Sequence, residues 1–119
     1  MPDWTITIPG PFPSTNHSYG YRQGRVYKKP GVEAWQTTVA HITKIARPKG
    51  WEPARQIRLI YDFHLFRKAD CDNAMKSLND AIALAIGVDD DRFLPCARSK
   101  VVGEKYPFVE IMVENVDES

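Results

Sequence analysis

Residues 55–66 read RQIRLIYDFHLF, and this stretch decides the fold. Apolar side chains alternate through it, and Ile60 and Phe66 add apolar character to the opposite face. The alternating set is Ile57, Leu59, Tyr61, Phe63 and Leu65. Alternation with apolar residues on both faces is typical of a strand in the interior of a sheet. We therefore expect 55–66 to form a central strand.

The rest of the chain predicts further strands and helices around this one. Alternation over residues 4–8, and apolar patterns at 98–102 and 107–116, predict three more strands, the last with Val109, Ile111 and Val113 on one face. Apolar residues every three or four positions predict a helix over 32–46 and a second helix over 75–86 that ends near Gly87. A short turn or helix is expected after Asp91. The sum is a single α+β domain over residues 1–119, with a mixed sheet of about four strands packed against two main helices.

Composition limits the class of protein. The 119 residues are 43% hydrophobic and 26% charged, which is ordinary for a soluble globular domain and argues against disorder. No apolar run reaches the roughly 20 residues that span a bilayer, and the first residues do not resemble a signal peptide, so we expect a cytoplasmic protein with no membrane partner. Cys71 and Cys96 are too few for a disulfide framework, and we expect both to be reduced.

Charge is distributed unevenly along the chain, although the formal net charge is only +1. Residues 1–68 hold 11 Lys or Arg against 4 Asp or Glu, while residues 69–119 hold 5 against 11. This pattern fits a basic binding face beside an acidic cluster, and two solvated faces are the alternative. Residues 19–29 interleave aromatic residues with cations, which suits phosphate contacts and base stacking, although an exposed hairpin would have a similar composition.

One polar segment is hard to explain by folding alone. It comprises Asp70, Asp72, Asn73, Lys76, Asp80 and the run Asp89, Asp90 and Asp91. In an extended stretch that leaves the central strand, Asp70 and Asp72 would point the same way. Carboxylates without histidine or thiolate partners favour a hard cation, Mg²⁺ or Mn²⁺. No glycine-rich phosphate loop is present, so we expect no nucleotide cofactor.

Each part of this segment also has an ordinary structural interpretation. Asp72 alone could be the N-cap of the second helix. Lys76 and Asp80 could form a surface pair one helical turn apart, and the aspartate run could be a solvated turn that caps a short helix. Three acidic groups close together in space would repel one another without a cation, so real clustering would imply a metal ion.

Taken together, these motifs resemble the RusA family of Holliday junction resolvases. The similarity rests on Asp70-Cys71-Asp72-Asn73, Lys76, Asp80-Ala81, Gly87 and the aspartate run, preceded by Pro11-Phe12-Pro13-Ser14-Thr15-Asn16, Arg25-Val26-Tyr27 and a helix around Trp35. The resemblance covers almost the whole chain. It implies a small homodimeric, Mg²⁺-dependent endonuclease, often of phage or prophage origin, that cuts four-way DNA junctions symmetrically in recombination and repair.

The resemblance also implies roles for individual residues. Asp70 and Asp72 take two metal-ligand positions, and Lys76 takes the position of an assisting lysine. The third aspartate is either Asp90 or Asp91, because spacing from Lys76 favours Asp91 and spacing to Lys100 favours Asp90. The basic residue that often precedes the first aspartate is replaced by Ala69, with Arg67 and Lys68 displaced. DNA contacts are assigned to Asn16, Arg22, Arg25, Lys28, Lys29, Arg67, Lys68 and Asn73.

Two rival functions remain open at this point. A metal-dependent nuclease that acts on flaps or single strands would carry the same carboxylates, because a carboxylate site does not reveal the shape of its DNA substrate. A non-catalytic nucleic-acid-binding module would use the aspartates only as helix caps.

Overall fold

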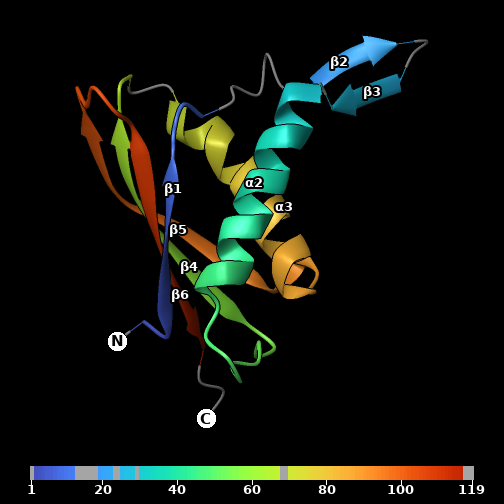
Figure 1. The fold of residues 1–119 in the computed structure, drawn as a ribbon, viewed down its shortest axis with the longest axis vertical. Coiled ribbons are helices and arrows are strands. Elements are labelled where there is room, and N and C mark those ends of the chain that lie inside the picture. Colours follow the sequence, from blue (N-terminus) through green and yellow to red (C-terminus); the bar gives the residue numbers. More distant parts are fainter. Residues whose placement is uncertain (1, 13–18, 23–24, 29, 68–69, 117–119) are drawn as a thin grey trace.

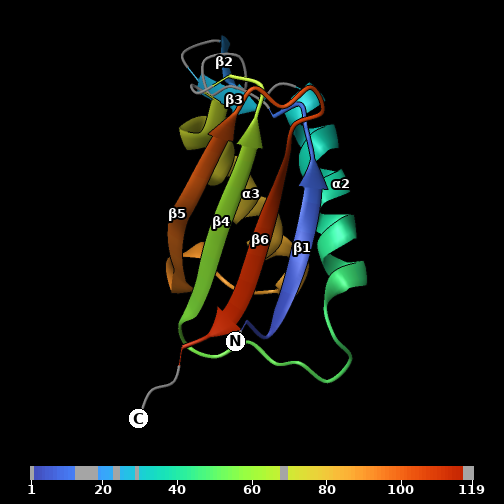
Figure 2. The ribbon, with the colours of Figure 1, turned by 90° about the vertical axis from the view of Figure 1, so that its left-hand side faces the viewer.

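The computed structural model describes residues 2–12, 19–22, 25–28, 30–67 and 70–116, and for residues 19–22, 25–28, 30 and 70–73 it describes the backbone only. Four strands form the main sheet: β1 (Trp4–Pro9), β4 (Ile57–Leu65), β5 (Phe93–Val102) and β6 (Phe108–Asn115). Their order is β1-β6-β4-β5, as Figure 2 shows. β5 runs parallel to β4, and the other neighbours are antiparallel. This confirms the prediction of a mixed four-stranded sheet.

The central strand is β4, between β6 and β5. All five alternating apolar side chains of β4 are fully buried, which confirms the prediction of an interior strand. On the opposite face, the carboxylate of Asp62 accepts hydrogen bonds from the guanidinium of Arg98 and from the hydroxyl of Ser99, the latter at 2.7 Å. The Arg98 contact is the main cause of a lowered pKa for Asp62. These three residues join β4 to β5 next to an irregularity in their register between Tyr61 and Asp62.

Two helices, α2 (Pro30–Ala46) and α3 (Asp70–Ile86), cover one face of the sheet (Figure 1). The helices pack on the sheet through apolar residues that include Val39, Leu78 and Ile82, all fully buried. Between the helices, the side-chain amide of Gln36 donates a hydrogen bond of 3.1 Å to the carbonyl oxygen of Ser77. α3 ends where Gly87 adopts φ +73°, a conformation that favours glycine, as the sequence predicts.

The boundaries differ most from the sequence predictions at two places. α3 begins at Asp70, whereas the sequence analysis places the start of its apolar face at 75 and an extended stretch before it. β5 begins at Phe93, five residues before the predicted 98–102 strand, and directly follows a short 3₁₀ helix, η1 (Asp90–Arg92). Both differences affect the acidic segment, because each changes the structure next to an aspartate.

The basic segment forms a separate hairpin of β2 (Tyr19–Arg22) and β3 (Arg25–Lys28), which projects from the N-terminal end of α2 (Figure 1). The hairpin anticipated as an alternative for residues 19–29 is therefore present, and its role in DNA binding stays a prediction. Within the described ranges, no helix is both long and apolar enough to cross a membrane. Cys96 is exposed and forms no disulfide.

Candidate active site

Several elements of the predicted site meet at one end of the molecule, the upper end in Figure 1. β4 ends there, both helices begin there, and the β2–β3 hairpin projects from it. Backbone N–H groups at the start of a helix are unpaired and favour anions, including phosphate. The two helix N-termini therefore favour anions at this end of the molecule.

Asp70 and Asp72 are the first and third residues of α3. The expectation that they leave β4 in an extended stretch is wrong, because the first helical turn already includes both. Positions two apart do not share a face in a helix, so convergence of the two side chains does not follow from extended geometry. The interpretation of Asp72 as an N-cap is also wrong, because an N-cap residue precedes the first helical turn. The metal-binding roles of Asp70 and Asp72 stay predictions.

Lys76 is exposed and lies four residues after Asp72 and four before Asp80. Positions four apart in a helix share a face, so α3 carries the positions of Asp72, Lys76 and Asp80 in one row. Asp80 is half-buried and lies beside the turn that follows the helix. The row thus leads from the start of α3 toward the aspartate run.

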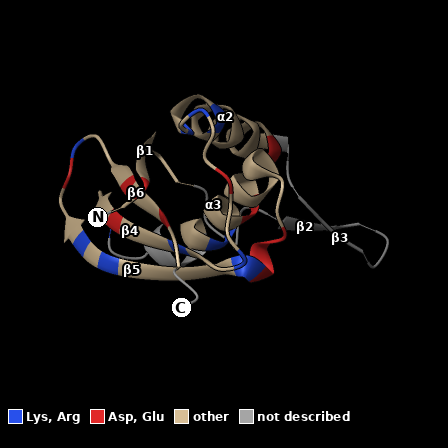
Figure 3. Ribbon diagram, turned by 90° about the horizontal axis from the view of Figure 1, so that it is seen from below, with Lys and Arg blue, Asp and Glu red and all other residues tan. Residues whose placement is uncertain are grey.

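The aspartate run lies in the turn between α3 and β5, where Figure 3 shows acidic residues beside the end of the helix. Asp89 is the N-cap of η1, and its carboxylate accepts a hydrogen bond of 3.4 Å from the backbone N–H of Asp91. This confirms that the run caps a short helix. The neighbouring carboxyl groups of Asp89 and Asp80 raise the pKa of Asp90, with the contact to Asp89 as the largest cause.

Asp90 and Asp91 have different surroundings. Asp90 shares a shallow depression with Asp80 and Asp89 beside the last turns of α3. Asp91 lines a separate pocket with Arg55, Gln56 and Arg92. Asp90 therefore has two carboxylates beside it, while two arginines line the same pocket as Asp91.

α3 holds the two groups of aspartates apart. With a rise of about 1.5 Å per residue, the backbone of Asp80 lies about 15 Å along the axis from that of Asp70. In the part of the chain that the structure describes, no group of three or more His, Cys, Asp or Glu side chains is arranged to hold a metal ion. Asp80, Asp89 and Asp90 are therefore neighbours that do not form a coordination shell.

The predicted DNA contacts are divided among several segments. Arg22, Arg25 and Lys28 belong to the hairpin strands, with Arg22 opposite Arg25. Asn73 lies in the first turn of α3. Arg67 is exposed at the end of β4, with its guanidinium 5.9 Å from the ring centre of Phe66. Asn16, Lys29 and Lys68 lie outside the described residues, so the structure does not place them.

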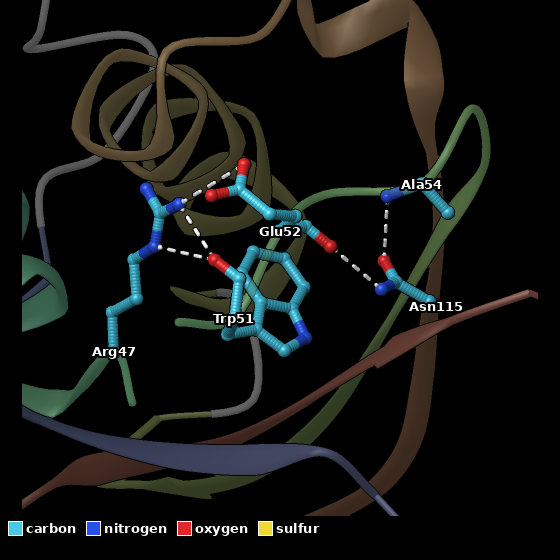
Figure 4. Close-up of polar contacts among 5 residues, drawn as sticks. All are labelled: Arg47, Trp51, Glu52, Ala54 and Asn115. Carbon is cyan, nitrogen blue, oxygen red and sulfur yellow. Dashed lines mark hydrogen bonds and ion pairs between the residues drawn. The ribbon is translucent and has the colours of Figure 1, made fainter. Parts of the chain in front are cut away.

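The opposite end of the molecule is held by structural contacts, shown in Figure 4. The guanidinium of Arg47 donates a hydrogen bond of 2.7 Å to the carbonyl oxygen of Trp51. The side-chain amide of Asn115 accepts a bond of 2.8 Å from the N–H of Ala54 and donates one of 2.9 Å to the carbonyl oxygen of Glu52. These contacts fix the loop between α2 and β4.

Sequence reasoning missed one feature of the end of the molecule where both helices begin. Phe66 and Arg67, which follow β4, share a pocket with Lys105 and Tyr106, which precede β6. The sequence shows an aromatic residue next to a cation in each pair. It does not indicate that the two pairs share a pocket, because they lie far apart along the chain.

Comparison with known protein families gives one result that bears on function. The family model described as endodeoxyribonuclease RusA matches residues 9–114. A comparison with curated protein sequences gave no match. The family match extends from the last residue of β1 to the last but one residue of β6.

Proposed function

Because the chain belongs to the RusA family of endodeoxyribonucleases, we propose that it resolves four-way DNA junctions as a Mg²⁺-dependent homodimer. The family match over residues 9–114 carries the enzyme class, which is hydrolysis of phosphodiester bonds in DNA. The junction substrate, the metal ion and the dimer are the parts proposed here. Recombination and repair of DNA are the processes that need such an activity.

Asp70 and Asp72 are proposed as two ligands of the metal ion, at the end of the molecule where both helices begin. Paired carboxylates supply the oxygen ligands that a hard divalent cation such as Mg²⁺, or Mn²⁺ in its place, prefers. When bound, such an ion neutralises charge on the phosphate and makes a bound water more acidic. Lys76, exposed one turn along α3 from Asp72, is proposed to stabilise negative charge on the phosphate group as a point cation.

Asp90 is proposed as the third ligand. Support comes from the raised pKa of Asp90, which the neighbouring carboxyl groups of Asp89 and Asp80 cause, and from the depression that these three residues share. Asp91 is the less suitable candidate, because it lies beside Arg55 and Arg92. A divalent ion near Asp90 would remove the repulsion that raises its pKa.

A second copy of the chain is proposed to complete each site, because α3 separates Asp70 from the acidic turn within one chain. β5 is an edge strand, and α3 lies behind β5 and β4 on the same side of the molecule (Figure 2). Two copies that meet along this side, related by a two-fold axis perpendicular to α3, would place their α3 helices antiparallel. The start of α3 in one copy would then approach the acidic turn of the other copy, and the symmetry would produce two equivalent sites.

The β5 side has the surface that such an interface requires. Leu94, Val101 and Val102 are 41%, 46% and 52% exposed on this edge strand. Exposed apolar residues on an unpaired edge favour association, and a two-fold interface needs only one self-complementary surface. Two equivalent sites also suit a four-way junction, whose resolution needs two symmetric cuts.

Asp70→Asn tests the proposal, because the substitution keeps the shape of the side chain and removes one negative ligand. We expect cleavage of a four-way junction in Mg²⁺ to be lost, while binding in EDTA persists or becomes tighter, since less negative charge opposes the phosphates. Flap, single-stranded and duplex DNA of the same sequence serve as comparison substrates. Preferred cleavage of a flap or single strand by the wild-type protein would favour the first rival, and cleavage that the variant retains would exclude the metal role of Asp70. Wild-type protein that binds but never cleaves would favour the binding module.

A further inference from the structure

A pocket of about 620 Å³ opens at the functional end of the molecule. Its volume is within the range of small-molecule sites, roughly 300–1,000 Å³. Residues from three segments line it: Pro9 at the end of β1 with Gly10, Pro11 and Phe12 after it, Phe66 and Arg67 after β4, and Lys105, Tyr106 and Pro107 before β6. We call it the aromatic pocket. Among these described lining residues, none carries a carboxylate.

Folding does not explain the two outer rings of the aromatic pocket. Phe66 is 57% exposed and Tyr106 is 74% exposed, so neither ring contributes much to the core. A cation lies over each ring. The guanidinium carbon of Arg67 is 5.9 Å from the ring centre of Phe66, and Nζ of Lys105 is 5.5 Å from the ring centre of Tyr106. The pocket therefore offers two aromatic surfaces, each paired with a positive charge.

The inner wall of the pocket is held in place by packing. The ring of Phe12 makes edge-on contacts with the rings of Trp35 and Phe63, with ring centres 6.4 Å and 6.1 Å apart. The N–H of Gly10 donates a hydrogen bond of 2.7 Å to the carbonyl oxygen of Pro107, and a Cβ at Gly10 would lie only 2.8 Å from the Pro107 ring. This close approach, which only glycine permits, brings the segment after β1 against the segment before β6. The wall thus exists before any ligand binds.

We propose that the aromatic pocket receives an unpaired nucleotide of branched DNA, with its base stacked on Phe66 or Tyr106 and its phosphate beside Arg67 or Lys105. Every base has a flat face that stacks on aromatic rings, and the adjacent phosphate needs a cation, so both features of the pocket are used. In a paired duplex the base faces are already covered by stacking. The pocket would therefore favour DNA in which a base has left the stack, such as the centre of a junction.

The position of the aromatic pocket relative to Asp70 links it to cleavage. This link rests on the proposed function. Phe66 precedes Asp70 by four residues, so their backbones are at most about 14 Å apart along the chain. A base held at Phe66 would thus place a neighbouring phosphate near the start of α3. The aromatic pocket would then select which phosphate meets the proposed metal ligands.

The test uses a short single strand of DNA that contains 2-aminopurine, a fluorescent base whose emission falls on stacking. In EDTA, the wild-type protein should quench this emission on binding. The double variant Phe66→Ala with Tyr106→Ala should lose the quenching and bind the strand about tenfold more weakly, as expected for one lost base–aromatic stack. Binding to fully paired duplex should change less than about twofold, because contacts with duplex DNA depend on the basic residues, which the double variant keeps.

Two further variants make the result specific. Tyr106→Phe keeps the ring and should keep the quenching. Ile45→Ala, at a residue 72% exposed near the C-terminal end of α2, removes a surface apolar group far from the pocket and should behave as the wild type. Thermal unfolding checks that each variant is folded. Quenching that survives in the folded double variant would overturn the proposal, and so would equal weakening for single strand and duplex.

The inference and the proposed function fail in different assays. A protein that cleaves four-way junctions in Mg²⁺ but shows no quenching that depends on Phe66 and Tyr106 would retain the function and lose the aromatic pocket. A protein that shows this quenching but cleaves no junction would retain the pocket and lose the resolvase proposal.

Discussion

The carboxyl groups of Asp89 and Asp80 raise the pKa of Asp90 above the ordinary value of 3.8. A raised pKa means that the folded state binds this proton more readily than the unfolded state does. The folded state is therefore destabilised as pH rises through the raised pKa, and it is unaffected where Asp90 is protonated in both states. At neutral pH the repulsion acts in full.

Asp90→Asn should therefore raise the thermal unfolding midpoint at neutral pH without a divalent ion, because it removes one of three neighbouring negative charges. The gain should shrink as pH falls below the ordinary carboxyl value, and it should also shrink when Mg²⁺ is added to the wild-type protein. Thermal unfolding followed by circular dichroism across this pH range measures both effects. Asp91→Asn is the matched control, because Asp91 lies beside Arg55 and Arg92. An equal or larger gain for the control would contradict the assignment of charge repulsion to Asp90.

Residue-scale predictions from sequence succeeded where local chemistry decides the outcome. Asp89 caps η1 because a short side chain can accept a hydrogen bond from an N–H two residues later. The start of α3 was misplaced because its first turn contains Asp70, Asp72 and Asn73 and therefore has no apolar face for periodicity to detect. Carboxylates are nonetheless favourable in a first turn, where they face the unpaired N–H groups.

At the scale of elements, the quality of prediction followed burial. β1, β4 and β6 each bury one face, so alternation predicts all three. β5 is an edge strand on which only Phe93 is buried, so its first half shows no alternation that would predict a strand. The separation of Asp70 from the acidic turn could not be predicted either, because it depends on how many residues between them are helical.

The exposed apolar edge of β5 leads to a prediction about assembly. Val101→Lys places a charge on the proposed two-fold interface, where the symmetry repeats it on the opposite copy. The wild-type protein should sediment as a dimer at micromolar concentration, and this variant should sediment as a monomer. Ile45→Lys changes a residue that is 72% exposed on the distant part of α2 and should remain a dimer. Sedimentation velocity distinguishes the two states, and a dimeric Val101→Lys protein would exclude this side as the interface.

On the scale of the whole molecule, a net charge of +1 conceals a basic N-terminal half. Arg22, Arg25 and Lys28 lie on the hairpin that projects from the functional end. Affinity for a four-way junction should therefore fall steeply with salt, as DNA-bound counterions are released. Arg25→Ala should reduce the slope of log affinity against log salt by about 1, if this side chain contacts one phosphate. Titrations in EDTA at several salt concentrations measure the slope, and an unchanged slope would remove Arg25 from the DNA contacts.

Asp70 and Asp90 lie near opposite ends of α3, so a metal site that uses both is either within one chain or shared by two chains. Mixed dimers of two variants distinguish these arrangements. Asp70→Asn and Asp90→Asn should each abolish junction cleavage in Mg²⁺ when present in both protomers. In a shared site, a mixed dimer of the two variants contains one site with both substitutions and one site with neither. In a single-chain site, every site of the mixed dimer contains one substitution.

Co-refolding the two variants should therefore restore nicking of one strand but not paired resolution, with about a quarter of the wild-type number of intact sites under random pairing. Denaturing gels detect the nick, and native gels detect resolved duplexes. Co-refolding Asp70→Asn with Asp72→Asn is the control, because both residues lie on the same turn of α3 and every mixed site would remain defective. Equal restoration by this control would reveal exchange or contamination. Inactivity of the mixed Asp70→Asn and Asp90→Asn dimers would contradict a site shared by two chains.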